Sequence, residues 1–253
     1  MNITRSAALW SAVFLLSGVY LISAETGFAQ SRPGWGEIWQ QRMTIGQAQL
    51  DSAFKLAESG KVNEALAMID QVIATDPNNW RSYFLKSAVL ILAKRGSEAL
   101  KQIDTSINLA RRSNVSAGLL AELYESKARS CIDYGRYDEA KKSLEQAVHL
   151  QPSDPTTLND LAWMLATSKD SRVRDGRRAV AIATKACNLS DWKNAFSIDT
   201  LAAAFATAGN FPDAVKYQQL AMSRLPPDDR KAQLPGMEQR LHQYSNGQTF
   251  TGI

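Results

Sequence analysis

The chain has 253 residues, of which 45% are hydrophobic, and a formal net charge of +4 at pH 7. This length and this apolar content are sufficient for a substantial buried core. The small positive charge lacks the strong electrostatic signature of a nucleic-acid-binding domain, so no nucleic-acid partner is predicted.

The first 29 residues have the composition of a secretory signal. Arg5 precedes a run of 16 uncharged residues, 7–22, and Gly27-Phe28-Ala29 is a small-x-small pattern suited to signal peptidase. Gln30 is then the predicted mature N-terminus, and the chain is predicted to be exported to the periplasm or secreted. The apolar run is shorter than the about 20 residues that span a bilayer. An uncleaved membrane anchor over residues 7–22 remains the alternative.

Three segments of the chain share one spacing. Gly60, Gly135 and Gly209 are each followed by an alanine five residues later and by a proline seventeen residues later. Successive copies lie 75 and 74 residues apart, which is about twice the ~34-residue period of a helix-turn-helix repeat. Small residues recur where the two helices of a pair must approach closely; they are Ala65, Ala99, Ala140, Ala179 and Ala214. The spacing predicts an all-α array of five helix pairs.

The predicted array follows a lead segment over residues 30–45 and covers residues 46–228. Its five repeats are 46–79, 80–113, 121–154, 155–194 and 195–228. The glycine after each first helix suits a left-handed C-cap. A proline disfavours helical geometry in the residue before it and so ends the second helix. Repeat two lacks this proline, and repeat four has a longer, charged link between its helices.

Residues 229–253 are predicted to form a C-terminal capping helix and a frayed tail. Asp228 or Asp229 could cap the start of this helix, and Pro235 should limit its first stretch. Met237, Leu241 and Tyr244 share one helix face that could cover the last repeat.

Repeat three carries a family resemblance. Its Gly-x4-Ala-x11-Pro pattern is accompanied by other matching positions, namely Tyr124, Ala128, Tyr137 and Ala147. This pattern resembles the tetratricopeptide repeat, over roughly residues 46–228. The stretch 158–211 looks like a bacterial variant of the repeat with a longer inter-helix loop. The resemblance implies a right-handed α-solenoid and a protein-interaction module without known chemistry.

In tetratricopeptide arrays, which the chain resembles, the first helix of each pair lines a concave groove. The groove residues expected from this resemblance are Phe54, Arg81, Phe84, Glu125, Arg129, Asn159 and Trp163, together with Leu50, Ala88, Glu122, Asp199 and Ala203. Arg129 and Trp163 are predicted to contact a partner, because Arg and Trp are enriched among binding hot spots. Trp163 could instead fill the seam between repeats three and four. The Lys- and Asn-rich clamp of chaperone-binding relatives is not matched.

The sequence contains no pattern that indicates catalysis. Neither of the two histidines, His149 and His242, has neighbours at metal-ligand spacing, and no phosphate-binding glycine loop or nucleophile elbow is present. We therefore predict no enzyme activity, no cofactor and no metal. Cys131 and Cys187 lie in different repeats and are expected to be buried thiols.

The segment 169–178 holds five basic and two acidic residues. It could contact an anion or a phospholipid, or serve a structural or enzymatic accessory role, but a solvated inter-helix loop is the favoured interpretation.

The sequence as a whole predicts an exported, non-catalytic scaffold that binds a protein or peptide partner. The alternative is an assembly factor of an envelope or secretion complex, tethered to the membrane through an uncleaved N-terminal helix.

Overall fold

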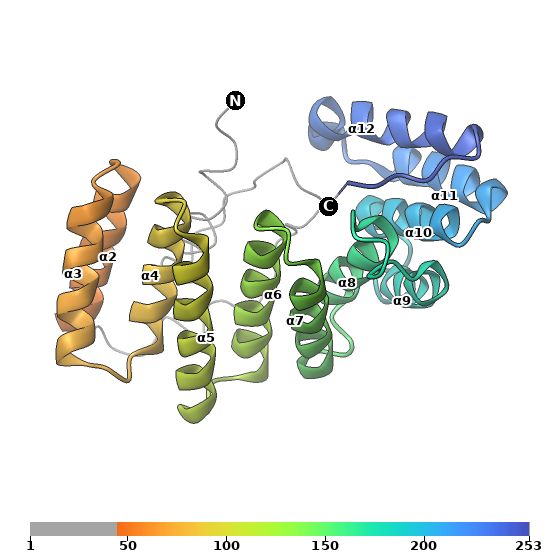
Figure 1. The fold of residues 1–253 in the computed structure, drawn as a ribbon. Coiled ribbons are helices and arrows are strands. Elements are labelled where there is room, and N and C mark those ends of the chain that lie inside the picture. Colours follow the sequence, from red (N-terminus) through yellow and green to blue (C-terminus); the bar gives the residue numbers. More distant parts are fainter. Residues whose placement is uncertain (1–44, 253) are drawn as a thin grey trace. The chain divides into compact units, whose positions relative to one another are not determined.

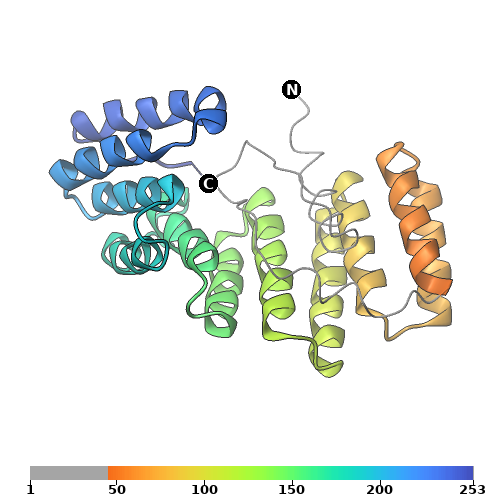
Figure 2. The same ribbon diagram turned by 180° about the vertical axis from the view of Figure 1, so that it is seen from behind.

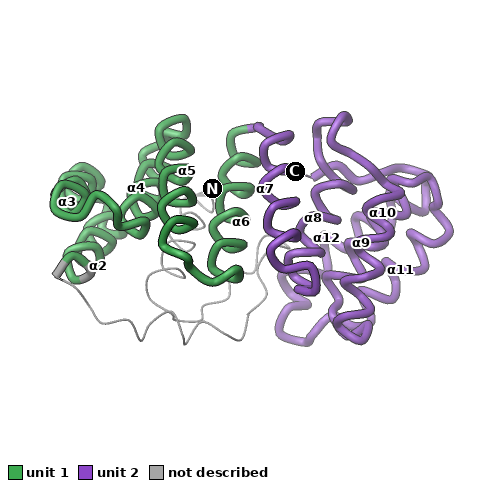
Figure 3. The backbone as a smooth tube through the Cα atoms, turned by 90° about the horizontal axis from the view of Figure 1, so that it is seen from below, with its two compact units in different colours: residues 1–22, 31–134 green, residues 23–30, 135–253 purple. Residues whose placement is uncertain are grey.

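The structure is a computed structural model that describes residues 45–252, and within this range it is built of helices without strands. The chain divides into two compact units, of which the described parts are residues 45–134 (unit 1) and 135–252 (unit 2) (Figure 3). The helices of unit 1 are α2 (Ile45–Glu58), α3 (Val62–Thr75), α4 (Trp80–Leu92), α5 (Gly96–Arg112) and α6 (Ala117–Asp133). Those of unit 2 are α7 (Tyr137–Leu150), α8 (Pro155–Thr167), α9 (Gly176–Leu189), α10 (Ala195–Thr207), α11 (Phe211–Arg224) and α12 (Pro227–Ser245).

Unit 1 contains the first two helix pairs and the first helix of repeat three. Each helix packs against the next along the chain, and α4 also contacts α2 (Figures 1 and 2). Most of α4 is buried, including Phe84, Leu85 and Leu90. Successive repeats are also joined by ion pairs between neighbouring helices, Lys86 with Asp70 and Lys127 with Asp104, each at 2.6 Å. Unit 1 is therefore a stack in which each helix covers the apolar side of the previous one.

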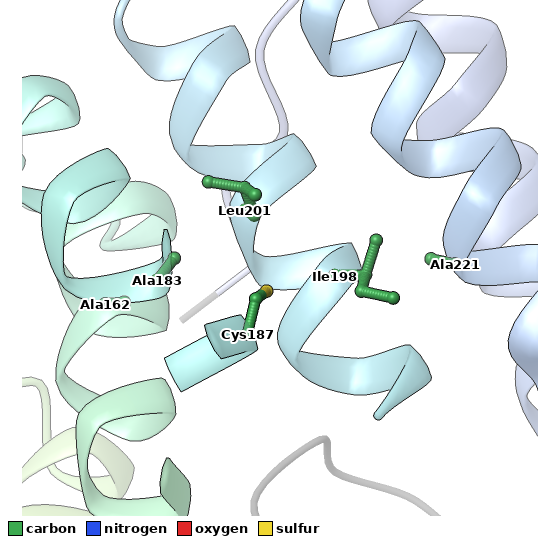
Figure 4. Close-up of a cluster of buried hydrophobic side chains, with 6 residues drawn as sticks. All are labelled: Ala162, Ala183, Cys187, Ile198, Leu201 and Ala221. Atoms are coloured by element: carbon green, nitrogen blue, oxygen red, sulfur yellow. The ribbon is translucent and has the colours of Figure 1, made fainter. Parts of the chain in front are cut away.

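Unit 2 is organised around α10, which packs against α8, α9, α11 and α12. Side chains from α8 to α11 form a cluster that is completely or almost completely shielded from solvent (Figure 4). Its members are Ala162, Ala183, Cys187, Ile198, Leu201 and Ala221. Half of the cluster is alanine, so the helix backbones can approach closely. Each helix alone could not bury its apolar stripe, and stacking provides the core.

The small-residue positions and the turn glycines follow the sequence prediction. The five recurring alanines are at most 1% exposed; they are Ala65, Ala99, Ala140, Ala179 and Ala214. Gly60, Gly135 and Gly209 all have positive φ, between 69° and 84°. A residue with a Cβ is disfavoured in that conformation, so glycine suits the turn between the helices of these pairs.

The two irregular repeats make their turns with other residues. In repeat two Lys94 adopts φ 59° between its helices, and Asn114, at φ 50°, stands where the closing proline is missing. In repeat four the chain leaves α9 through Asp191 and Trp192, at φ 50° and 58°. These side chains lack the freedom of glycine, so the surrounding packing must stabilise the turns.

The C-terminal helix differs from its predicted form. Helix α12 begins at Pro227, with Pro226 as its N-cap, and continues through Pro235 to Ser245. Pro235 is exposed and costs the helix one backbone hydrogen bond without ending it. Met237 and Tyr244 are each 1% exposed, so the predicted apolar face does bury against the rest of unit 2. The apolar burial on this face compensates for the proline.

The last residues, which we expected to fray, are in contact with the folded unit. The chain turns back at the end of α12 (Figure 1), where Gly247 has φ 68°. The Gly252 N–H donates a hydrogen bond of 3.0 Å to the Thr167 carbonyl at the end of α8. The tail is therefore folded back onto the first helix of repeat four.

The predicted signal or anchor and the lead segment up to residue 44 lie outside the described residues. Between residues 45 and 252 no helix combines the length and the apolar character needed to cross a membrane.

Candidate functional site

The expected groove residues of unit 1 do not form one exposed surface. Phe84 is only 2% exposed, so it packs in the core and the expectation that it lines a groove is corrected. Leu50 and Ala88 are buried in the same way. Phe54 is half-buried on α2. Arg81 is half-buried and lies over the ring of Trp80, its guanidinium carbon 4.6 Å from the ring centroid, and burial lowers its pKa.

Glu125 and Arg129 lie one turn apart on α6 and are both half-buried. Burial raises the pKa of Asp133, which lies one turn after Arg129 on α6. The positive charge of Arg129 opposes this shift. Arg129 belongs to unit 1 and Trp163 to unit 2. Their joint contact with a partner stays a prediction.

In unit 2 the two predicted residues share one face of α8, because Asn159 precedes Trp163 by one turn. Asn159 is 6% exposed, and its Oδ1 accepts no hydrogen bond from the described residues. Trp163 is half-buried. Its indole lies 5.9 Å from the Phe250 ring, centroid to centroid, and 5.5 Å from the guanidinium carbon of Arg240. The ring therefore packs against side chains from the end of the chain.

Arg240 of α12 is fixed by a carboxylate on α10. Its Nε and Nη2 donate to the two oxygens of Asp199 at 3.0 and 2.7 Å. Gln218 of α11 donates a third hydrogen bond to Asp199, at 2.6 Å. Asp199 and Gln218 are 5% and 0% exposed, so this polar network lies inside the unit. A bidentate pair holds the guanidinium plane in one orientation, which sets its position against the aromatic rings.

The nearby Tyr244 hydroxyl shows how strongly this network is buried. Burial raises the pKa of Tyr244, and the negative charge of Asp199 raises it further, while Arg240 opposes them.

The Trp163 site, as we name it here, consists of Trp163, Arg240 and Phe250, with Asp199 and Gln218 holding Arg240. Its side chains come from the first helices of repeats four and five, from α11, from the capping helix and from the tail. It combines an apolar ring surface, a fixed cation and a backbone carbonyl, that of Thr167, which accepts from Gly252. The side chains of this site include no nucleophile paired with a base.

Arg240 and Phe250 were missed by sequence reasoning. Phe250 is the single aromatic residue in the mostly polar tail SNGQTFTGI, and this isolated aromatic residue was the available signal. Asp199 was expected on the groove face, but as a surface group and not as the buried partner of an arginine.

The charged segment 169–178, which covers the loop after α8 and the start of α9, makes several ion pairs and hydrogen bonds within unit 2. Arg172 donates to both oxygens of Asp170 at 3.0 and 2.7 Å, and this contact lowers the pKa of Asp170 to about 2. Arg174 donates to the Ser168 carbonyl, and Arg178 to Glu145, each at 2.6 Å. These internal contacts favour the solvated-loop interpretation over an anion site.

In residues 45–252 no group of three His, Cys, Asp or Glu side chains is placed to hold a metal ion. Cys131 and Cys187 are both buried and not in a disulfide, as expected, and burial raises the pKa of the Cys187 thiol to about 12.

Comparison with solved structures finds similar folds at low sequence identity. YrrB, described as a TPR protein with an unusual peptide-binding site, shares 15% identity over 75% of this chain and 90% of its own, with a TM-score of 0.55. MamA from Desulfovibrio magneticus shares 16% over 72% and 97%, with a TM-score of 0.56. TPR-like repeats of a putative kinesin light chain from Podospora anserina share 17% over 72% and 97%, with a TM-score of 0.58.

Among curated proteins, the Protein STIP1 homolog of Dictyostelium discoideum is 29% identical over 133 residues, which is 51% of this chain. The chain spans about a fifth of that relative, 22% of its length. No protein-family model matches the chain. The structural matches agree with the Gly-x4-Ala-x11-Pro spacing and the stacked helix pairs. The chain therefore has the all-α fold of a tetratricopeptide-repeat solenoid.

Proposed function

We propose that the protein is a non-catalytic interaction scaffold that binds an extended peptide segment of a protein partner at the Trp163 site. The observation that carries the proposal is that a peptide segment already lies there: the chain's own tail packs Phe250 against Trp163 and bonds Gly252 to the end of α8. The peptide-binding site of YrrB, a protein of the same fold, supports the proposal by analogy.

The site has the properties of a binding hot spot. Trp163 is a rigid aromatic anchor that is only partly buried. Arg240 donates two hydrogen bonds to Asp199, and these fix its guanidinium in the absence of a partner. A preorganised guanidinium loses little conformational entropy on binding, and aromatic and arginine side chains dominate binding energies at interfaces.

A peptide library tests this function. Peptides selected on the full chain should bind Trp163→Ala about 30-fold more weakly, which corresponds to about 2 kcal/mol. The matched control is Trp192→Ala, which removes another indole of unit 2, one that stacks on Tyr217 at 5.8 Å. The control should keep peptide affinity even where it lowers the melting temperature. Selected peptides that bind both variants equally would place binding elsewhere and contradict the proposal.

The compartment is part of the proposal and rests on residues 1–29. A positively charged start, an apolar run and a small-x-small site support export with cleavage before Gln30. The alternative is a membrane-tethered assembly factor that keeps residues 7–22 as an anchor. The mass of the protein isolated from its host separates the two: loss of about 29 residues supports export as a released protein, and an intact N-terminus supports the tether.

A further inference from the structure

The C-terminal tail makes side-chain and backbone contacts with the Trp163 site. The Phe250 ring lies 5.9 Å from the Trp163 ring and 5.4 Å from the guanidinium carbon of Arg240. Two residues later, the Gly252 N–H donates to the Thr167 carbonyl at 3.0 Å. An aromatic side chain and a backbone N–H of one short segment thus engage α8 and α12 together.

The sequence of the segment fits this arrangement, because a glycine lies beside the Phe250 ring. A Cβ added to Gly252 would overlap the tip of the Phe250 ring, so the ring lies directly over this glycine. The absence of a side chain at Gly252 leaves room for the Phe250 ring, while the Gly252 backbone N–H bonds to α8. The fitting pattern is an aromatic residue followed two positions later by glycine.

The segment is attached to the fold by little else. Thr249, Thr251 and Gly252 are exposed, whereas Tyr244, at the end of α12, is fully buried. The helix is closed before the tail begins, because the Gln248 N–H donates to the Gln243 carbonyl across Gly247 at 2.9 Å. The tail can therefore leave the Trp163 site without unwinding α12.

We propose that residues 249–252 are a built-in competitor for the Trp163 site, and that a partner displaces them with an extended segment of the same pattern, an aromatic residue followed two positions later by glycine. The inference rests on the proposed function. The tail reaches the site at the high effective concentration of a tethered ligand, on the order of millimolar. A partner segment then binds only if its affinity for the site exceeds that of the tail, or if the tail has been released from the site.

The test uses a labelled peptide with the sequence of residues 246–252, amidated at its C-terminus, and fluorescence anisotropy. A chain truncated after Gln248 keeps the hydrogen bond that closes α12 and should bind the peptide. The full chain should bind about tenfold more weakly, if the peptide Kd is near 0.1 mM and the tethered tail acts at about 1 mM. Full-length Phe250→Ala should bind like the truncated chain. Full-length Thr251→Ala, a change at an exposed residue of the same tail, should stay as weak as the unmodified chain.

Equal affinity of the full and truncated chains, or no binding to the truncated chain, would overturn the inference. The peptides selected for the proposed function separate the two failures. If those peptides bind in a Trp163-dependent way with equal affinity for both chains, the function stands and the competitor role fails. If no peptide binds either chain, both fail. A dimer of the full chain that dissociates on truncation would show the tail bound to a second copy and would also overturn the inference.

Discussion

Asp199 and Arg240, 41 positions apart in the sequence, form a bidentate ion pair that links α10 to α12 inside unit 2. Their side chains are 7% and 13% exposed. Both ionised groups are partly removed from water, so their mutual geometry and the Gln218 hydrogen bond must offset a desolvation cost. The net contribution of the pair to stability is therefore small. Its main effect is to fix the position of Arg240 against the aromatic rings.

Removal of either Asp199 or Arg240 should nevertheless lower the stability of the fold. Asp199→Ala leaves the Arg240 charge and the Gln218 amide without their acceptor, and the free energy of unfolding should fall by about 3 kcal/mol. Urea unfolding measures this change. The control is Glu98→Gln at the exposed pair with Arg95, which should leave the urea midpoint unchanged. Equal midpoints for Asp199→Ala and the unmodified chain would show that the pair is not formed.

Trp163→Ala should affect binding more than stability. Trp163 is half-buried and packs mainly against the tail and Arg240, so its loss leaves the core of unit 2 intact. We expect a melting temperature close to that of the unmodified chain. Phe84→Ala is the contrasting variant, since Phe84 is 2% exposed; it should lose about 3–5 kcal/mol of stability. A drop for Trp163→Ala as large as that for Phe84→Ala would make Trp163 a seam residue.

Two glycines at helix starts should respond differently to alanine. A Cβ at Gly176 would lie 2.5–2.8 Å from backbone atoms of Thr207 and Ala208, so α9 and α10 would have to separate. Gly176→Ala should cost about 1–3 kcal/mol, as overpacking does. At Gly96 the three atoms nearest to the added Cβ belong to the ring of Tyr134, which is 37% exposed and can turn away. Thermal melting of the two variants measures the difference. A loss of stability for Gly96→Ala as large as that for Gly176→Ala would contradict the close approach of α9 and α10 at Gly176.

The buried thiol predicts an alkaline loss of stability. Burial raises the pKa of Cys187 in the folded state to about 12, whereas an unfolded thiol has a pKa of about 8.5. The stabilisation is complete below about pH 8.5 and is lost as the pH rises towards about 12, because the unfolded chain releases its proton first. The unmodified chain should therefore lose more stability than Cys187→Ala between pH 7 and pH 10. Parallel urea curves for the two proteins measure the difference, and equal losses would contradict a buried, protonated thiol.

The repeat spacing was enough to predict the fold because each turn is a local event. The residue type alone predicts a left-handed backbone conformation at Gly60, Gly135 and Gly209, and all three have positive φ. The turns at Lys94 and at Asp191-Trp192 could not be predicted in this way, since no residue there favours positive φ as strongly as glycine. Tertiary packing decides these turns, and propensity does not.

The Trp163 site was only half predictable for a similar reason. Periodicity on α8 placed Asn159 and Trp163 on one helix face, which the structure reproduces. The contacts of Trp163 with Arg240 and Phe250 join residues 77 and 87 positions apart. The Arg240 contact follows from the packing of α12 on unit 2, and the Phe250 contact follows from the fold-back of a mostly polar tail, which composition alone assigns to disorder. The burial of Phe84 likewise depends on which neighbours cover α4, and the spacing of its apolar residues does not reveal this.

The indole N–H signal of Trp163 in a ¹⁵N NMR spectrum tests the central claim most directly, with Trp163→Phe providing the assignment. Truncation after Gln248 should shift this signal, because the Phe250 ring no longer lies beside the indole. Addition of the peptide of residues 246–252 to the truncated chain should return the signal to its position in the full chain. A signal that stays at one position in all three samples would contradict the assignment of the Trp163 site as a peptide-binding surface occupied by the chain's own tail.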